Sequence, residues 1–121
     1  MATIENIKAY PPKERLVGLT SDGRGGGLVF PAAPAYRCQR CGTVTPFGLG
    51  AKEPPAFSFA IRKSFDRASA AVQLSSPYEK DYCDLVCGKC GQPVRVVYGI
   101  HEFAMSCYRY LPQQVLVYEL T

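Results

Sequence analysis

The sequence predicts a mostly β protein, or an α+β protein if its one candidate helix forms, in a single unit that spans residues 1–121. Three observations predict this class. β-Branched and aromatic residues gather in short runs, of which 94–100 and 114–120 are the clearest. Ten prolines and eleven glycines interrupt the chain. Only 62–74 places apolar residues at helical spacing, so we expect small antiparallel sheets joined by turns.

The N-terminal half contains short strands joined by turn-forming residues. Residues 14–20 have the composition of a strand, and a glycine-rich connection separates them from a second strand at 28–30. Together they predict a loose hairpin over 14–30. Prolines then lead an extended chain to the first cysteine pair, and residues 56–61 have the composition of a further strand.

The C-terminal half predicts one helix and three strands. Within 62–74, apolar residues recur at helical spacing and the alanines favour a helix. The strand 81–86 leads into the second cysteine pair, and the strand 94–100 leaves it. Residues 114–120 form the last predicted strand.

Two segments have nearly the same sequence: 36–43 and 85–92 each contain a Cys-x-x-Cys-Gly motif. Two intervening residues allow both thiolates of a pair to face one metal ion, at about 2.3 Å from each sulfur. The glycine accepts a positive φ angle and allows backbone amides to approach the sulfurs. Each pair supplies half of a tetrahedron. The sequence therefore predicts one structural zinc ion with four thiolate ligands: Cys38, Cys41, Cys87 and Cys90.

These motifs and their strand-like flanks resemble the zinc-ribbon group, in which two such knuckles on β-hairpins share one zinc ion. The resemblance covers 35–44 and 81–100, and it implies a closed site; many zinc-ribbon proteins bind nucleic acid. The chain departs from a compact ribbon in the insertion 43–84 between the knuckles. Three alternatives for the cysteines are rubredoxin-like iron binding, core thiols without metal, and a thioredoxin-type redox pair.

The charge of the chain bears on its partner. The formal net charge of +4 treats every cysteine as neutral; four thiolates add −4 and a zinc ion adds +2, which leaves a net charge near +2. Bases in or beside the knuckles either neutralise the zinc–thiolate centre from the solvent or bind phosphate, and we expect the first role. These bases are Arg37, Arg40, Lys89 and Arg95.

Tyrosines and arginines are concentrated near the C-terminal strands. Both residue types are enriched at protein interfaces, and both also stack on nucleobases. Together with the knuckle bases they give the candidate contacts with a macromolecular partner: Arg40, Lys89, Arg95, Tyr108, Arg109 and Tyr110.

Three further residues have chemistry to consider. Cys83, Cys107 and His101 offer ligands for a second metal, and the last two offer a catalytic pair, but core cysteines and a structural histidine are the expected outcome. The chain has a single histidine, no phosphate-binding glycine loop before a helix and no paired-carboxylate pattern. The sequence therefore predicts neither an enzyme nor a small-molecule substrate.

These observations predict a non-enzymatic, zinc-containing interaction module that binds a protein, as an inhibitor, an adaptor or a bacterial toxin-immunity protein does. The alternative is a nucleic-acid-binding zinc-ribbon protein, and the third hypothesis is a redox or metal-handling protein. No apolar run approaches the roughly 20 residues that span a bilayer, and the N-terminus lacks the pattern of a secretion signal. We therefore expect a cytoplasmic protein with reduced cysteines and no membrane contact.

Overall fold

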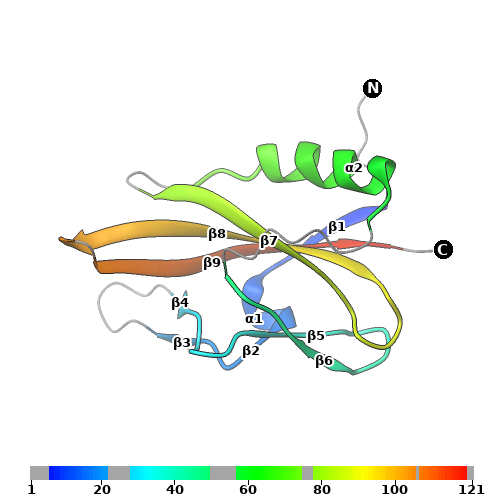
Figure 1. Cartoon of the computed structure of the whole chain (residues 1–121), viewed down its shortest axis with the longest axis horizontal. Helices are drawn as coiled ribbons and strands as arrows, with labels where there is room; N and C mark the ends of the chain where they lie inside the picture. The colour runs from blue at the N-terminus through cyan, green and yellow to red at the C-terminus, as the bar shows by residue number, and fades with distance from the viewer. Residues whose placement is uncertain (1–5, 22–27, 50–56, 75–77, 106, 120–121) are drawn as a thin grey trace.

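The computed structural model describes residues 6–21, 28–49, 57–74, 78–105 and 107–119. About half of these residues form antiparallel strands, far more than the two helices contain, so the predicted mostly β class is confirmed. The strands form a four-stranded, a three-stranded and a two-stranded sheet (Figure 1). Helix α2 lies on one side of the four-stranded sheet, and the two smaller sheets lie on the other (Figure 1).

The four-stranded sheet has the strand order β1-β9-β8-β7, and every neighbouring pair is antiparallel. Its strands are β1 (Ile7–Tyr10), β7 (Glu79–Val86), β8 (Pro93–Ala104) and β9 (Cys107–Tyr118). The predicted strand 81–86 is confirmed within β7. The predicted strand 94–100 lies within β8. The predicted strand 114–120 is confirmed over 114–118; residue 119 follows the end of β9, and residue 120 lies outside the described residues.

The hairpin of β8 and β9 extends farther than predicted, because 101–104 lengthen β8 and 107–113 lengthen β9. Pro112 argues against a regular inner strand, since proline has no N–H group to donate. The structure accommodates it at a bulge: Tyr98 pairs with Pro112, whereas the preceding residue of β8 pairs with Gln114. One extra residue on β9 therefore lies at the irregularity, where the ladder is already interrupted.

The smaller sheets come from the N-terminal half. Their strands are β2 (Leu16–Val17), β5 (Ala35–Arg37) and β6 (Val44–Pro46) in one sheet, and β3 (Thr20–Ser21) and β4 (Leu28–Val29) in the other. Pairing of β3 with β4 confirms the centre of the predicted hairpin, whose connection 22–27 lies outside the described residues. The predicted strand 14–20 is wrong at its start, where α1 (Pro12–Arg15) forms one helical turn. Proline favours the first turn of a helix because its φ angle is already set.

Helix α2 (Phe59–Ala70) confirms the predicted helix 62–74 over 62–70. It begins earlier than expected and also ends earlier, since 71–74 are not helical. Ser58 caps its first turn, since the Ser58 Oγ accepts a hydrogen bond from the Ile61 amide at 3.2 Å. The predicted strand 56–61 is wrong over its described part, because 59–61 belong to this first turn. Ile61 and Phe65, one turn apart, pack in the same apolar cluster, and a short apolar run alone does not distinguish a strand from a helix.

The four-stranded sheet has an apolar core on each face. Beneath α2, the buried residues are Phe65, Val97 and Leu116. Beneath the smaller sheets lies the larger core, and it contains Tyr36, Cys83, Leu85, Val94, Val96, Tyr98, Val115 and Val117. Neighbouring residues of a strand point to opposite faces, so Val96 and Val97 belong to different cores. Cys38 and Cys87 are members of the larger core, which therefore continues into the knuckles.

Lys80 of β7 caps the C-terminal end of α2. Its Nζ donates to the carbonyl oxygens of Ser69 and Val72, both at 2.7 Å, near a helix end whose last carbonyls lack helical partners. We expect Lys80→Met to lower the free energy of unfolding by about 1 kcal/mol. Urea unfolding measures this difference in free energy. The control is Lys63→Met, which removes an exposed lysine from the first half of α2. Equal stability of the two variants would contradict the cap.

Candidate metal centre

The two cysteine pairs lie in the turns of two matching hairpins. Arg37 pairs with Val44 at the end of one hairpin, and Val86 pairs with Pro93 at the end of the other. In both turns, the amide of the first cysteine donates to the carbonyl five residues later, and the glycine amide donates to the carbonyl of the first cysteine. These N···O distances are 2.8–3.0 Å. The sequence similarity of the two segments therefore corresponds to the same backbone structure.

The glycine of each motif is required by its backbone conformation. Gly42 has a φ angle of 77° and Gly91 one of 75°, which confirms the predicted positive values. A Cβ atom built on either residue would meet nothing within 4 Å. The requirement is therefore conformational rather than steric, because L-residues rarely adopt this region.

The structure brings the four predicted cysteine ligands together. Their Sγ atoms all lie within 4.8 Å of one another. The Cys38 and Cys90 sulfurs are 3.7 Å apart, and those of Cys41 and Cys87 are 3.4 Å apart. Sulfurs at the corners of a tetrahedron with bonds of about 2.3 Å lie about 3.8 Å apart. The spacing therefore fits one metal ion, and no other such cluster of His, Cys, Asp or Glu occurs among the described residues.

Backbone amides point at the sulfurs in both turns. The sulfur of the first cysteine accepts hydrogen bonds from the amides two and three residues later: Arg40 and Cys41 for Cys38, and Lys89 and Cys90 for Cys87. Hydrogen bonds of this kind favour the charged form of a thiol. The turns are thus built to stabilise thiolates, which is the form of cysteine that binds metals.

Burial and hydrogen bonding act in opposite directions on the thiols. Burial raises the pKa of Cys38 to about 12. The hydrogen bond with the Thr43 side chain lowers the pKa of Cys41 to about 6. Four thiolates at these distances repel one another, so they ionise together only when a cation neutralises them. The cluster therefore has the chemistry of a metal site.

Two polar side chains connect the knuckles to each other and to the large sheet. Thr45 Oγ1 accepts a hydrogen bond from the Gly88 amide at 2.9 Å and so joins the two hairpins. The buried Gln92 accepts from the Cys38 thiol at 3.7 Å through Oε1 and donates to Glu119 at 3.4 Å through Nε2. Neither side chain was predicted to take part in the site, although Gln92 directly follows the glycine of a knuckle.

The predicted partner contacts lie in two places. Arg40 and Lys89 are exposed on the two knuckles. Tyr108 and Tyr110 are exposed on β9, and Arg109 between them is half-buried. The segment 108–110 of β9 pairs with 100–102 of β8, at the end of β8 that is remote from the knuckles. The two groups therefore lie at opposite ends of the sheet (Figure 1).

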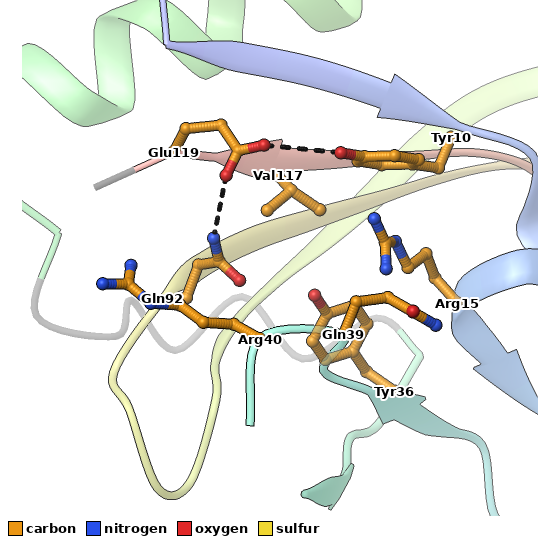
Figure 2. A pocket seen from close by; sticks show the side chains of 8 residues that line it. All are labelled: Tyr10, Arg15, Tyr36, Gln39, Arg40, Gln92, Val117 and Glu119. Carbon is orange, nitrogen blue, oxygen red and sulfur yellow. Dashed lines mark hydrogen bonds between the residues drawn. The ribbon is translucent and has the colours of Figure 1, made fainter. Parts of the chain in front are cut away.

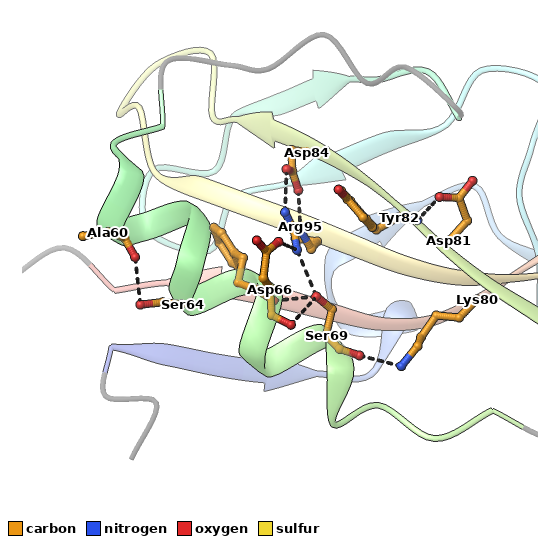
Figure 3. A network of polar contacts seen from close by, with 10 residues as sticks. Ala60, Ser64, Asp66, Ser69, Lys80, Asp81, Tyr82, Asp84 and Arg95 are labelled. Carbon is orange, nitrogen blue, oxygen red and sulfur yellow. Dashed lines mark hydrogen bonds and ion pairs between the residues drawn. The ribbon is translucent and has the colours of Figure 1, made fainter. Parts of the chain in front are cut away.

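Arg95 does not belong to either group. The expectation that it lies in solvent beside the metal is wrong, since its side chain is only 1% exposed. Its guanidinium faces α2 (Figure 3) and binds both carboxylate oxygens of Asp84, at 2.7 and 2.9 Å, and Asp66 at 2.8 Å. The reason is strand alternation, because Val94 and Val96 on either side of it fill the opposite core.

The residues considered for a second metal site do not come together in the described part of the chain. Cys83 is buried in the larger core and pairs with Val96, whereas His101 pairs with Arg109 near the other end of β8. The His101 ring packs against the Tyr78 ring at a centroid distance of 5.3 Å. The side chain of the third residue, Cys107, lies outside the described ones.

Comparison with known proteins gives no assignment for this chain. No protein-family model matches it, and no curated protein or solved structure is significantly similar to it. A search of the described helices finds none with the length and apolar character needed to cross a membrane. What the fold and the site define is a mostly β protein with a four-cysteine candidate metal centre on two hairpins.

Proposed function

We propose that this protein is a non-enzymatic binding module, stabilised by one zinc ion, whose partner is another protein. The observation that carries the proposal is an exposed surface of ordered aromatic side chains at the end of the sheet remote from the cysteines. The inhibitor, adaptor and toxin-immunity roles expected from the sequence all need such a surface.

The four-cysteine cluster supports a structural zinc ion. Four protein thiolates fill a tetrahedral zinc site and leave no position for water or substrate, as in structural rather than catalytic sites. Iron accepts the same ligands, so elemental analysis of the purified protein distinguishes the two metals. Thiolate ligands need reduced cysteines, and the proposal therefore includes a reducing compartment such as the cytoplasm.

The aromatic surface consists of Tyr108 and Tyr110 on β9 together with the adjacent Val29, Phe30 and Leu49. The two tyrosines are 51% and 39% exposed. Together with Pro31 and Arg109, these residues surround a hollow of about 380 Å³. A concave area of apolar side chains with tyrosines and an arginine is typical of the centre of a protein interface.

Ring contacts hold the aromatic surface in place. The Tyr110 ring meets the buried Tyr98 ring edge to face, with a centroid distance of 6.1 Å. Phe30 makes the same kind of contact with Tyr98 at 5.8 Å and with Phe47 at 6.2 Å. Side chains ordered before binding lose less conformational entropy on association. An apolar side chain of a partner that enters the hollow would therefore meet a preformed site.

We expect the double variant Tyr108→Ser/Tyr110→Ser to weaken partner binding by about 30-fold or more, because buried interface tyrosines commonly contribute 2 kcal/mol or more. The partner is isolated by affinity capture with the wild type, purified, and titrated calorimetrically against both proteins. Phe59→Ser is the matched control, since Phe59 is 75% exposed on α2, on the other side of the sheet. A partner that binds the double variant as tightly as the wild type would overturn the assignment of this surface.

The second candidate function is nucleic-acid binding through the knuckles, and the exposure of Arg37, Arg40 and Lys89 favours it. Titration of the zinc-loaded protein with duplex and single-stranded DNA and RNA at two salt concentrations separates it from the first. Nucleic-acid affinity that falls steeply with salt in the wild type, and less steeply in Arg40→Ala, would favour nucleic-acid binding over the protein partner.

A further inference from the structure

A pocket of about 310 Å³ lies between α1, the first knuckle and the end of β9 (Figure 2). Its polar lining includes Arg15, Arg40, Tyr36, Gln92 and Glu119. This volume is at the lower end of the range of small-molecule sites in proteins, which starts at about 300 Å³. The pocket lies away from the aromatic surface, so its role is independent of the proposed function.

Arg15 is the unusual residue of this pocket. Its guanidinium carbon lies 3.7 Å from the centre of the Tyr10 ring, so the planar group stacks on an aromatic face. Its Nε atom is buried and has no hydrogen-bond acceptor among the described residues. A buried donor without an acceptor is costly, and stacking on a ring does not supply one. Arg95 of the same protein shows the usual arrangement, since its guanidinium binds two carboxylates.

The one carboxylate of the pocket is already engaged. Glu119 accepts hydrogen bonds from the Tyr10 hydroxyl and the Gln92 amide, each at 3.4 Å, and lies 3.9 Å from the Lys8 Nζ. Figure 2 shows the hydrogen bonds of Glu119 to Tyr10 and Gln92, and the Arg15 guanidinium next to the Tyr10 ring. Tyr36 and Gln39 line the Arg15 side of the pocket, and the Arg40 guanidinium lies beside Gln92 (Figure 2). None of these three side chains is a carboxylate that could pair with Arg15.

We propose that this pocket binds the oxyanion group of a small molecule, a carboxylate or a phosphate, in the fork of the Arg15 guanidinium. A guanidinium presents parallel N–H groups that match two oxygens of either anion. The Tyr36 hydroxyl, which lines the same pocket, is a further donor. An anion in the pocket would bind the terminal nitrogens of this guanidinium, because the buried Nε atom is out of reach of solvent.

The pocket depends on the metal centre for its shape. Gln92 in its wall accepts from the Cys38 thiol, and Tyr36 directly precedes the first knuckle. The full-length, zinc-loaded protein is therefore the material for the test. Inorganic phosphate and acetate are added separately in an NMR titration, and sodium chloride at equal ionic strength controls for salt effects.

We expect saturable chemical-shift changes at Arg15 and Tyr36 with phosphate, acetate or both, and none with chloride. Saturation by one anion alone identifies which oxyanion the site takes. In Arg15→Met the dissociation constant should rise by about tenfold or more, because charge-assisted hydrogen bonds are lost. Arg15→Lys keeps the charge without the fork and should also bind more weakly. Lys13→Met removes an exposed charge from the same turn and should leave the affinity unchanged.

Two results would overturn the oxyanion site. One is the absence of saturable shifts with either anion. The other is wild-type affinity in Arg15→Met. Arg15→Met could lose its metal and unfold, and Arg15→Lys then serves as the test. Wild-type affinity in a zinc-loaded Arg15→Lys protein would overturn the proposal.

Discussion

Replacing Cys38 with serine is expected to abolish metal binding and the cooperative fold together. Cys38 is fully buried, and its sulfur is one of four that lie within 4.8 Å. A structural zinc ion contributes about 10–16 kcal/mol in small domains, whereas the net stability of a domain is about 5–15 kcal/mol. If loss of one ligand abolishes metal binding, the stability lost is therefore as large as the whole net free energy of unfolding. Elemental analysis and thermal unfolding followed by circular dichroism measure the two effects.

The matched control for this experiment is Cys83→Ala. Cys83 is also buried in the larger core but lies outside the four-cysteine cluster. This variant should keep its metal and lose only the stability of one buried side chain, about 1–2 kcal/mol. A metal-free Cys38→Ser protein that unfolds cooperatively at the wild-type temperature would contradict the structural role. Removal of the metal from the wild type by a chelator should reproduce the effect of Cys38→Ser.

The candidate metal centre could be predicted from the sequence because its geometry is local. Each Cys-x-x-Cys-Gly turn fixes two sulfurs through hydrogen bonds within six residues, and the glycine marks the one position with positive φ. The strands beside the knuckles were equally accessible, since Val86 and Val94 lie in runs of β-branched and apolar residues. Only the contact between the two turns depends on the tertiary fold. It could still be predicted, because a tetrahedral metal ion needs four ligands and each turn supplies two.

The parts that could not be predicted depend on contacts distant in the sequence. Residues 59–61 form a helical turn because Ser58 caps it and Ile61 packs with Phe65 over the large sheet. Pro112 lies in a strand because a bulge accommodates it. The pocket beside the first knuckle combines α1, β5 and the end of β9, and no local pattern links Arg15 with Glu119.

The pairing of Arg95 with Asp84 could have been predicted from the sequence but was not. A hairpin closed by a six-residue turn from 87 to 92 pairs Asp84 with Arg95 directly across the two strands, as observed. Opposite charges at such positions attract each other. What the sequence does not contain is α2 above this pair, which buries the guanidinium and supplies Asp66 and Ser69 as further partners (Figure 3).

The side chain of Arg95 is the main polar connection between α2 and the sheet. Its Nε and one terminal nitrogen bind Asp84, and its other terminal nitrogen binds Asp66 at 2.8 Å and Ser69 Oγ at 2.9 Å. The guanidinium carbon also lies 3.9 Å from the centre of the Tyr82 ring. Burial lowers the pKa of Arg95, but the hydrogen bonds to Asp84 and Asp66 outweigh it and the net direction is upward. The residue therefore remains a cation wherever the protein is folded.

We expect Arg95→Met to lower the free energy of unfolding by about 3–5 kcal/mol, because it leaves the carboxylate of Asp84 buried without a cation. Asp84 is 9% exposed, whereas Asp66 is 57% exposed and is solvated without Arg95. The double variant Asp84→Leu/Arg95→Met should recover much of this loss, since no charge is then left unpaired. Urea unfolding measures the free energy of unfolding of the single and the double variant. The control is Arg67→Met, which removes an exposed arginine from α2.

Whether the variant keeps its metal ion distinguishes the effect of Arg95→Met from that of Cys38→Ser. Arg95 and the cysteine cluster lie on opposite faces of the sheet, so Arg95→Met should keep its metal ion in the absence of urea while it unfolds at a lower urea concentration. A stability of Arg95→Met within about 0.5 kcal/mol of the wild type would show that the network contributes no net free energy. Loss of the metal from folded Arg95→Met would show that the two faces are coupled, against the independence argued from their separate cores.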